Sequence, residues 1–459
     1  MSIWRAGTTN LDCGSEAAAL QGGGLESRKA GKRKAAGSRA AMERRKAAAP
    51  LPHSKTAFAA VGVIARLSVC MSASHINTPQ EAAAPQAPLT HAKVFTGSER
   101  LLSLDTFRGF TMFWIVGGEA LMVGIQHLGH NGVIDLIVRQ LSHTPWIGLR
   151  FEDCIWPSFM LMVGVSVPLS LARRSLTENY NQQLAHAIRR TVVLFLLGSV
   201  RESLFLHTPC LIELSSALQP ISIAYFVAFL VVKKSWKFQA GLAASILAAY
   251  ACLLAFVPAP GIPAGTYVLN HNLVHSVDIA LLGQHRWDTW PYRDEGWGTF
   301  LSTIPTISTT LFGLLIGKLL VASNSKAAQA KAIGGMGVIL LAVGFGLSPL
   351  IPIEMKMWTT SYGLASAGVA CLELLFFFWL VDMAGYKKWT VLFRPFGMNA
   401  VFIYMFTSLI SISAGVDVFA DPIAVHLGKG GFLFQAIAVM GVEWLILFWM
   451  MKRRIFVRP

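Results

Sequence analysis

The sequence predicts an all-α integral membrane protein with about ten transmembrane helices, both termini being cytoplasmic. Of its 459 residues, 54% are hydrophobic and only 14% are charged, whereas charged residues make up about a quarter of an ordinary globular domain. Apolar segments of about 20 residues, the length that crosses a bilayer as a helix, recur from residue 100 to the C-terminus. The lysines and arginines between these segments alternate between sides. This composition excludes a soluble enzyme.

The first 98 residues differ in composition from the rest of the chain. They hold 13 of the 39 Lys and Arg but only 5 of the 24 Asp and Glu, and residues 28–46 alone carry nine basic residues amid Ala and Gly. Such segments do not bury enough apolar surface to fold. The apolar stretch 57–71 is short and contains Arg66, which makes it a poor span. We therefore expect a disordered extension over 1–98, a natural start at Met71, and a transmembrane domain over 99–459.

The predicted spans follow the apolar segments in order, and the basic residues between them test the count. Of the 26 Lys and Arg beyond the extension, 19 fall on one side, as the positive-inside rule requires of the cytoplasmic face. This places the protein in the inner (plasma) membrane as a multi-pass protein with an even number of spans. The spans are 107–126, 154–172, 191–206, 211–232, 238–258, 299–321, 332–351, 358–382, 395–413 and 431–451.

Several function classes lack support in the sequence. The net charge of +15 divides between the extension and the cytoplasmic loops, so it does not indicate a nucleic-acid partner. The six Cys are scattered without a CxxC pair, which argues against a disulfide framework or a structural zinc, and we expect no metal. The chain has no P-loop, HExxH or GxSxG motif, so ATP-driven transport and serine-hydrolase chemistry have no motif behind them.

Polar residues in or beside the predicted spans are the candidates for function, because burying them in a bilayer is costly unless they are paired. Glu119 lies in the first span, where the alternatives are a hydrogen-bonded helix contact and a functional acid. His143 stands in an outer loop just before the pair Glu152 and Asp153. Carboxylates beside a histidine favour a general base, although an interfacial histidine is the alternative.

A set of ordered motifs resembles the heparan-alpha-glucosaminide N-acetyltransferase family, in the manner of a bacterial relative. The motifs recur in order over about 100–450, which is essentially the whole predicted membrane domain. They are Arg100–Gly109, His143–Gly148 with Asp153, Trp156–Phe159, Asp294–Gly296, Leu301–Pro305, Pro352–Tyr362 and Gly397–Ala400.

The resemblance implies transfer of an acetyl group from cytoplasmic acetyl-CoA, as co-substrate, to the amine of a glucosamine-type sugar on the outer side. It assigns His143 as the base or acyl carrier, with Asp153 beside it. The family often carries Asn on the first membrane helix where this chain has Glu119, so the acid either orients His143 or binds an ammonium substrate. The partners expected are an amino-sugar acceptor and membrane lipids, with a homodimer as one option.

The remaining site residues follow from the chemistry that this activity requires. We assign substrate binding to Trp146, Asn399, Trp358, Lys356 and Glu295, of which Trp146, Lys356 and Asn399 offer donors for an oxyanion. Cations for the CoA phosphates are assigned to Arg108, paired with Asp105, and to Arg173 and Arg174, which equally fit plain positive-inside charge. Two alternatives stay open: an O-acyltransferase of envelope glycans, which Glu119 favours, and a sugar or lipid-linked sugar transporter.

Overall fold

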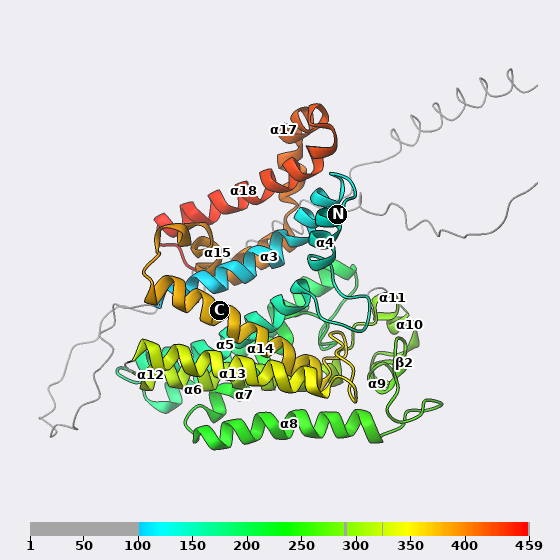
Figure 1. Cartoon of the computed structure of the whole chain (residues 1–459), viewed down its shortest axis with the longest axis vertical. Coiled ribbons are helices and arrows are strands. Elements are labelled where there is room, and N and C mark those ends of the chain that lie inside the picture. The colour runs from blue at the N-terminus through cyan, green and yellow to red at the C-terminus, as the bar shows by residue number, and fades with distance from the viewer. Residues whose placement is uncertain (1–100, 289–291, 324, 458–459) are drawn as a thin grey trace, which may run out of the picture. The chain divides into compact units, whose positions relative to one another are not determined.

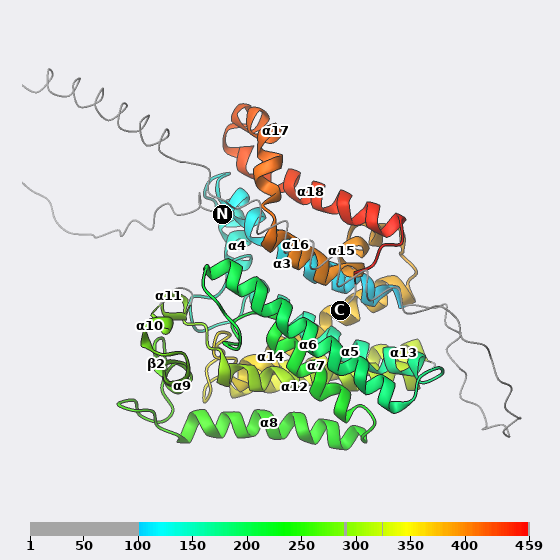
Figure 2. The same cartoon turned by 180° about the vertical axis from the view of Figure 1, so that it is seen from behind.

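The computed structural model describes residues 101–288, 292–323 and 325–457, and the predicted extension 1–98 lies outside them (Figures 1 and 2). The described chain is almost entirely helical, with one two-stranded antiparallel hairpin in the connection before α12. The elements are α3 (Leu102–Gln126), α4 (Gly132–Gln140), α5 (Phe151–Arg174), α6 (Tyr180–Leu206), α7 (Leu218–Val231), α8 (Trp236–Phe256), β1 (Tyr267–Val268), β2 (His271–Asn272), α9 (Leu273–Leu282), α10 (Gln284–Trp287), α11 (Tyr292–Glu295), α12 (Phe300–Ala322), α13 (Lys326–Leu347), α14 (Thr360–Phe377), η1 (Phe378–Met383), η2 (Lys388–Leu392), α15 (Arg394–Met398), α16 (Ala400–Leu409), α17 (Ile412–His426), η3 (Gly428–Gly430) and α18 (Gly431–Lys452).

The prediction of an all-α polytopic membrane protein is confirmed, with seven or eight candidate spans. Among the residues that the structure describes, seven helices are long and apolar enough to cross a bilayer, namely α3, α5, α8, α12, α13, α14 continued by η1, and α18. An eighth span results if α16 and α17, which meet at a 73° bend, are counted as one. The predicted span 211–232 starts late, because α7 begins only at Leu218 and has 14 residues. The predicted span 191–206 lies within the more polar α6, which carries Arg189, Arg190, Arg201 and Glu202.

The C-terminal part departs furthest from the predicted pattern. The expected span 395–413 is divided among α15, α16 and the first residues of α17 rather than forming one straight helix. The segment after it, expected as an outer loop, is helical over Ile412–His426. Short apolar pieces have no periodicity that distinguishes a continuous helix from a broken one.

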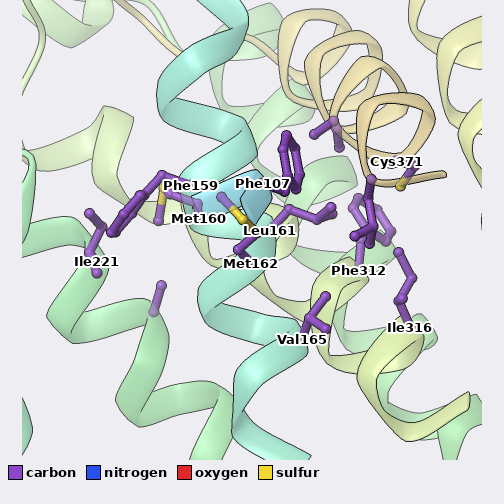
Figure 3. Close-up of a cluster of buried hydrophobic side chains, with 14 of the residues drawn as sticks. Phe107, Phe159, Met160, Leu161, Met162, Val165, Ile221, Phe312, Ile316 and Cys371 are labelled. Atoms are coloured by element: carbon purple, nitrogen blue, oxygen red, sulfur yellow. The ribbon is translucent and has the colours of Figure 1, made fainter. Parts of the chain in front are cut away.

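The centre of the fold is formed by α5, α12 and α14. The most apolar 18 residues of α5, of α12 and of α14 continued by η1 are 67, 67 and 61% buried, whereas those of α13 are 22% buried. Their side chains join one core cluster with Phe107 of α3 and Ile221 of α7, part of which Figure 3 shows around α5. Close approach of α5 and α12 depends on glycine. A Cβ added at Gly164 would lie 1.9 Å from the carbonyl oxygen of Thr310, and one at Gly313 would lie 1.9 Å from that of Leu161.

Replacing Gly164 by Ala is expected to destabilise the protein by about 2 kcal/mol or more, because neither backbone has room for a methyl group. Thermal unfolding of the purified protein in detergent measures the effect as a lower Tm. Gly335→Ala on α13 is the matched control, since nothing lies within 4 Å of a Cβ added there. Equal Tm values for the two variants would contradict this account of the α5–α12 contact.

Three long connections meet at the end of the helices where α5 and α12 begin. Gly148 donates its N–H to the carbonyl of Ile353, and Gly298 donates to that of Lys356. The indole of Trp146 donates to the carbonyl of Tyr267 at 2.7 Å. The described parts of three connections, 141–150, 257–288 with 292–299, and 348–359, are therefore fixed to one another, and the candidate site lies among them.

Candidate active site

His143 and Asp153 form the centre of the candidate site, as predicted from their sequence positions. His143 Nδ1 lies 3.0 Å from Asp153 Oδ1, and the side chain of Asp153 is fully buried whereas that of His143 is 40% exposed. A carboxylate facing Nδ1 selects the tautomer in which Nδ1 carries the proton. The lone pair of Nε2 is then available to take a proton from a substrate.

Asp153 is held in place by donors on every side. Its Oδ2 accepts from the hydroxyl of Thr144 at 2.6 Å and from the N–H of Arg150 at 2.9 Å, while Oδ1 also accepts from the N–H of Thr144 at 3.3 Å. Arg150 precedes the first turn of α5, where a negative charge is favoured by the helix dipole. The guanidinium of Arg150 binds the carbonyl of His143 at 2.9 Å. These bonds preorganise the histidine before any substrate arrives.

Aromatic side chains surround the pair in a closed sequence of contacts. The ring of His143 packs edge-on against Trp297 at 5.7 Å, Trp297 lies 6.4 Å from Trp156, and Trp156 lies 4.9 Å from Trp358. Trp358 in turn packs edge-on against Tyr362 at 5.2 Å, and the hydroxyl of Tyr362 donates to the backbone carbonyl of Asp153 at 2.6 Å. We call these residues the aromatic cluster. It includes the predicted Trp358 and adds Trp156, Trp297 and Tyr362, which were not assigned a role from the sequence.

Trp358 has an unusual backbone conformation within the aromatic cluster. Its φ is +51°, and its side chain is 1% exposed, with a buried Nε1 that has no hydrogen-bond partner among the described residues. Holding a tryptophan in the left-handed region costs on the order of 1–3 kcal/mol and persists only where the surroundings enforce it. The conformation is enforced by the turn 352–359, which Thr359 stabilises by donating its hydroxyl to the carbonyl of Pro352.

Lys356 and two carboxylates lie beside the aromatic cluster. Lys356 Nζ lies 5.8 Å from the centre of the Trp297 ring, and Glu295 accepts a hydrogen bond from Trp297 Nε1 at 2.8 Å. Burial lowers the pKa of Lys356, while Glu295, Glu354 and Asp153 act in the opposite direction. Burial raises the pKa of Glu354 to about 8, although its carboxylate accepts the N–H groups of Met357 and Lys356. The predicted Lys356 and Glu295 are thus brought to the site.

Glu152 adds a second acid that the sequence identified only as a neighbour of Asp153. It interacts electrostatically with His143, Asp153 and Glu119, and its Oε2 is buried with no hydrogen-bond partner among the described residues. A Cβ added at Gly118 of α3 would lie 3.6 Å from that oxygen and 3.4 Å from the ring of Trp114, whose Nε1 is also buried and has no hydrogen-bond partner in the described part of the chain. Glu152 Oε2 and Trp114 Nε1 are therefore available to bind a ligand, and Gly118 has no side chain that would fill the space beside them.

Glu119 does not orient His143 directly. It is exposed on α3, and among the described residues the carboxylate within hydrogen-bond distance of His143 Nδ1 belongs to Asp153. The interaction of Glu119 with Glu152 places it at the α3 side of the site. Glu119 was expected either to orient His143 or to bind an ammonium substrate, and the structure shows no contact for the first role among the described residues.

Trp146 belongs to the site region but not as an oxyanion donor. Its Nε1 is committed to the carbonyl of Tyr267, and its ring lies 6.0 Å from that of His275. Gly296 separates them, with φ +74°, and a Cβ there would lie 2.8 Å from the Trp146 ring. Trp146 thus fixes the loop that carries His143 onto the hairpin.

His275 is a buried neutral histidine that stabilises the same loops. Its Nε2 donates to the carbonyl of Gly296 at 2.9 Å, and its Nδ1 accepts from the amide of Asn272 at 3.0 Å. Burial lowers the pKa of His275 to about 4, assisted by the charge of Lys356 and opposed by the bond to Gly296. Unfolding allows this residue to take up a proton that the folded state excludes.

Between pH 6.5 and 4 the unfolded protein binds more protons at His275 than the folded protein, so stability decreases as the pH falls through this window. The pKa difference corresponds to about 3 kcal/mol. We expect the Tm of the wild type to fall in this range more steeply than that of His275→Gln, which carries no titrating group. Asp278 and Glu354, whose pKa values burial raises to about 6 and about 8, oppose the trend equally in both proteins. Parallel Tm curves would contradict the assignment.

Five predicted residues, Asn399, Arg108, Asp105, Arg173 and Arg174, lie away from His143. Asn399 is fully buried near the start of α3, where its amide binds the backbone of Ile455 and Val457 at 3.1 and 3.0 Å, so it fixes the C-terminal segment. Arg108 pairs with Asp105 at 3.5 Å, as predicted, and donates to Ser166 at 2.8 Å.

Arg173 and Arg174 end α5 and are exposed, with Arg174 3.8 Å from Glu178. Twenty residues of helix separate Arg173 from Asp153, which is about 30 Å at 1.5 Å per residue. Phosphates bound at this end of α5 therefore require a donor that extends along the helices to reach His143.

The site combines a base, an oriented carboxylate, a nearby ammonium and an unpaired acid in a partly buried aromatic setting. These groups suit proton removal from a nucleophile and stabilisation of developing negative charge on an acyl carbonyl. In the described part of the chain, no group of three or more His, Cys, Asp or Glu is placed to hold a metal ion.

Comparison with known proteins finds relatives of one kind. The heparan-alpha-glucosaminide N-acetyltransferase of Mus musculus is 23% identical over 375 residues, covering 68% of this chain and 53% of that protein. The enzyme of the same name from Homo sapiens is 23% identical over 371 residues, covering 67% and 52%. The chain spans about half the length of these curated relatives, and it matches no protein-family model.

Proposed function

We propose that the chain, a distant homologue of heparan-alpha-glucosaminide N-acetyltransferase at 23% identity, belongs to that family and transfers an acetyl group from acetyl-CoA to the amine of an amino sugar. The observation that carries the proposal is the His143–Asp153 pair at 3.0 Å, with the histidine accessible and the carboxylate buried. An amine attacks a thioester only when it is unprotonated, so the reaction needs a base where the acceptor binds.

The reaction assigned to the pair is transfer of an acetyl group from the thioester sulfur to the amine nitrogen. The nitrogen of the amine forms a bond to the thioester carbonyl carbon, the C–S bond breaks, and the CoA sulfur leaves as a thiolate. His143 Nε2 takes the proton that the amine loses, and Asp153 stabilises the resulting imidazolium, as a carboxylate does in other base-assisted acyl transfers. The proton then passes to the thiolate. Lys356 is the cation assigned to the carbonyl oxygen while it carries negative charge.

The route through an acetyl-imidazole on His143 uses the same residues in two steps. In either route the predicted topology, with both termini cytoplasmic, places His143 on the outer side of the membrane and the donor on the inner side. The phosphates of the donor are assigned to the basic end of α5, at Arg173 and Arg174, in keeping with the length that α5 spans.

Proteoliposomes test the proposal directly. Labelled acetyl-CoA is supplied on one side and glucosamine on the other, and we expect labelled N-acetylglucosamine to accumulate with the wild type. An acceptor panel with glucosamine, a primary alcohol analogue and no sugar separates N-transfer from O-transfer. Transport of unlabelled sugar without transfer of the label would reject the acetyltransferase in favour of a transporter.

The acid Glu152 is assigned to the acceptor as its ammonium form approaches. Its Oε2 is buried, has no hydrogen-bond partner among the described residues and is within electrostatic reach of His143, so an ammonium group placed there satisfies the oxygen. The ammonium gives its first proton to solvent through His143, and the neutral amine then attacks the thioester with the histidine free to act as base. We expect Glu152→Gln to raise KM for glucosamine about tenfold, the value of one charge-assisted hydrogen bond, with kcat nearly unchanged. Glu119→Gln is the control and should change KM less, because Glu119 is exposed. Equal effects of both variants would contradict this role for Glu152.

A further inference from the structure

An apolar cavity of about 470 Å³ lies between α3, α14 and the η1–α15 segment, and its lining does not include His143. We call it the aromatic groove. Its lining is Phe110 of α3, Phe376 and Phe377 of α14, Leu380 of η1, and Tyr386, Trp389 and Phe393. A second cavity of about 350 Å³ shares Phe110, Phe376 and Phe377 and continues along α14 to Val369, Leu372 and Glu373, whose carboxylate is already bound by the hydroxyl of Ser158.

The aromatic groove opens at the outer surface of a membrane-spanning helix. Phe376 is 52% exposed and Tyr386 63% exposed, and the span Thr360–Met383 is one of the helices apolar enough to cross the bilayer. An apolar, open cavity at this position is in contact with lipid rather than water. Its carbon lining fits a hydrocarbon chain, whereas the pantetheine arm of CoA carries amides that would leave their hydrogen bonds unmade there.

One end of the aromatic groove is basic. Lys387 and Lys388 stand between the lining residues Tyr386 and Trp389, and Arg394 follows the lining residue Phe393. Lys326 donates to the backbone carbonyl of Asp382 at 2.6 Å, next to the same segment. The acid at this edge is Asp382, which accepts the N–H of Ser103 at 3.4 Å and interacts with Lys326 and Lys387. We call the four cations the basic rim.

Two buried donors point to a ligand with acceptor oxygens. Trp389 Nε1 and Arg394 Nε are both buried and have no hydrogen-bond partner among the described residues. An unpaired buried donor costs about 1–3 kcal/mol, and these two flank Phe393, where the aromatic groove meets the basic rim. Phosphate and ester oxygens at the top of a lipid tail are acceptors of the right kind.

We propose that the aromatic groove and the basic rim form a binding site for one anionic phospholipid. An acyl chain fills the aromatic groove, and the phosphate lies against Lys387, Lys388 and Arg394, with an ester or phosphate oxygen accepting from Trp389 Nε1. Basic pockets beside membrane helices bind anionic headgroups by the same combination of charge and apolar contact. This site is separate from the proposed acetyl transfer.

Native mass spectrometry of the detergent-solubilised full chain tests the proposal. The probes are phosphatidylglycerol and phosphatidylcholine with identical acyl chains. We expect one phosphatidylglycerol to stay bound per chain under conditions that remove phosphatidylcholine. The double variant Lys388→Gln, Arg394→Gln should bind it about 30-fold more weakly, since each cation near an anionic lipid contributes about fivefold.

Matched variants separate the site from general surface charge. Trp389→Phe keeps the apolar contact but removes the donor and should weaken binding, whereas Trp449→Phe, on the exposed face of α18, should not. Lys388→Gln alone alters an exposed side chain and so preserves the fold, and its control is the exposed Lys237→Gln. Equal retention of both lipids, or no response to Lys388→Gln, would overturn the proposal. Release of phosphatidylglycerol mole for mole by added CoA would assign the aromatic groove to the acyl donor instead.

Discussion

His143→Ala is expected to lower kcat for acetyl transfer by about 10³-fold while leaving the fold intact. A positioned general base contributes about 10²–10⁴-fold, and removing the histidine eliminates the group that takes the proton from the amine. The side chain is 40% exposed, so its truncation leaves no large cavity. Label transfer in proteoliposomes measures the rate, and Tm in detergent checks the fold.

His127→Ala is the control for this variant. His127 lies at the end of α3, where its ring stacks on Phe432 at 4.0 Å, outside the candidate site. It should transfer acetyl groups at the wild-type rate. Wild-type activity of His143→Ala would remove the base from the proposed mechanism, and loss of activity in both variants would show that the assay responds to damage in general.

Asp153→Asn is expected to lower kcat by a similar or larger factor, about 10³–10⁴-fold, although the shape of the side chain is kept. The amide presents an N–H where His143 Nδ1–H now finds an acceptor, so the histidine is held in the wrong tautomer or released. Asp153 is fully buried and accepts from Thr144 and Arg150 as well. We therefore also expect a lower Tm, because an amide replaces one acceptor by a donor.

Thr144→Val separates the two consequences of changing Asp153. It removes one hydrogen bond to Asp153 Oδ2 but leaves the contact with His143 intact. Its Tm should fall, with kcat reduced much less than in Asp153→Asn. If the two variants lose activity in proportion to their loss of Tm, the role of Asp153 is stability alone, and the tautomer argument fails.

The sequence was sufficient to predict the all-α membrane class and the proximity of His143 to Asp153. His143 and Asp153 are ten residues apart in one loop-to-helix segment, so their contact depends on local geometry, which a motif records well. The acids and aromatic residues around them come from α5, α14 and the loop before α12. Their contacts depend on packing between distant segments, for which one sequence contains no direct signal.

Two further differences have a clear physical origin. Trp146 and Asn399 were assigned to the substrate as hydrogen-bond donors for an oxyanion. Both have partners, but these are backbone carbonyls and N–H groups within the chain. Two of the ten predicted spans, 191–206 and 211–232, are not among the candidate spans of the described residues, because α6 carries charged residues and α7 has only 14 residues. Hydropathy also does not record a break within an apolar stretch, as at the bend between α16 and α17.

The hydrogen bond from Tyr362 to the backbone of Asp153 joins residues 209 apart in sequence. Contacts of such separation form late, after the intervening chain has been made and placed. During synthesis, α5 is therefore made long before α14, which completes the aromatic cluster around His143. A ribosome-bound chain that ends before Tyr362 therefore carries His143 without its enclosure.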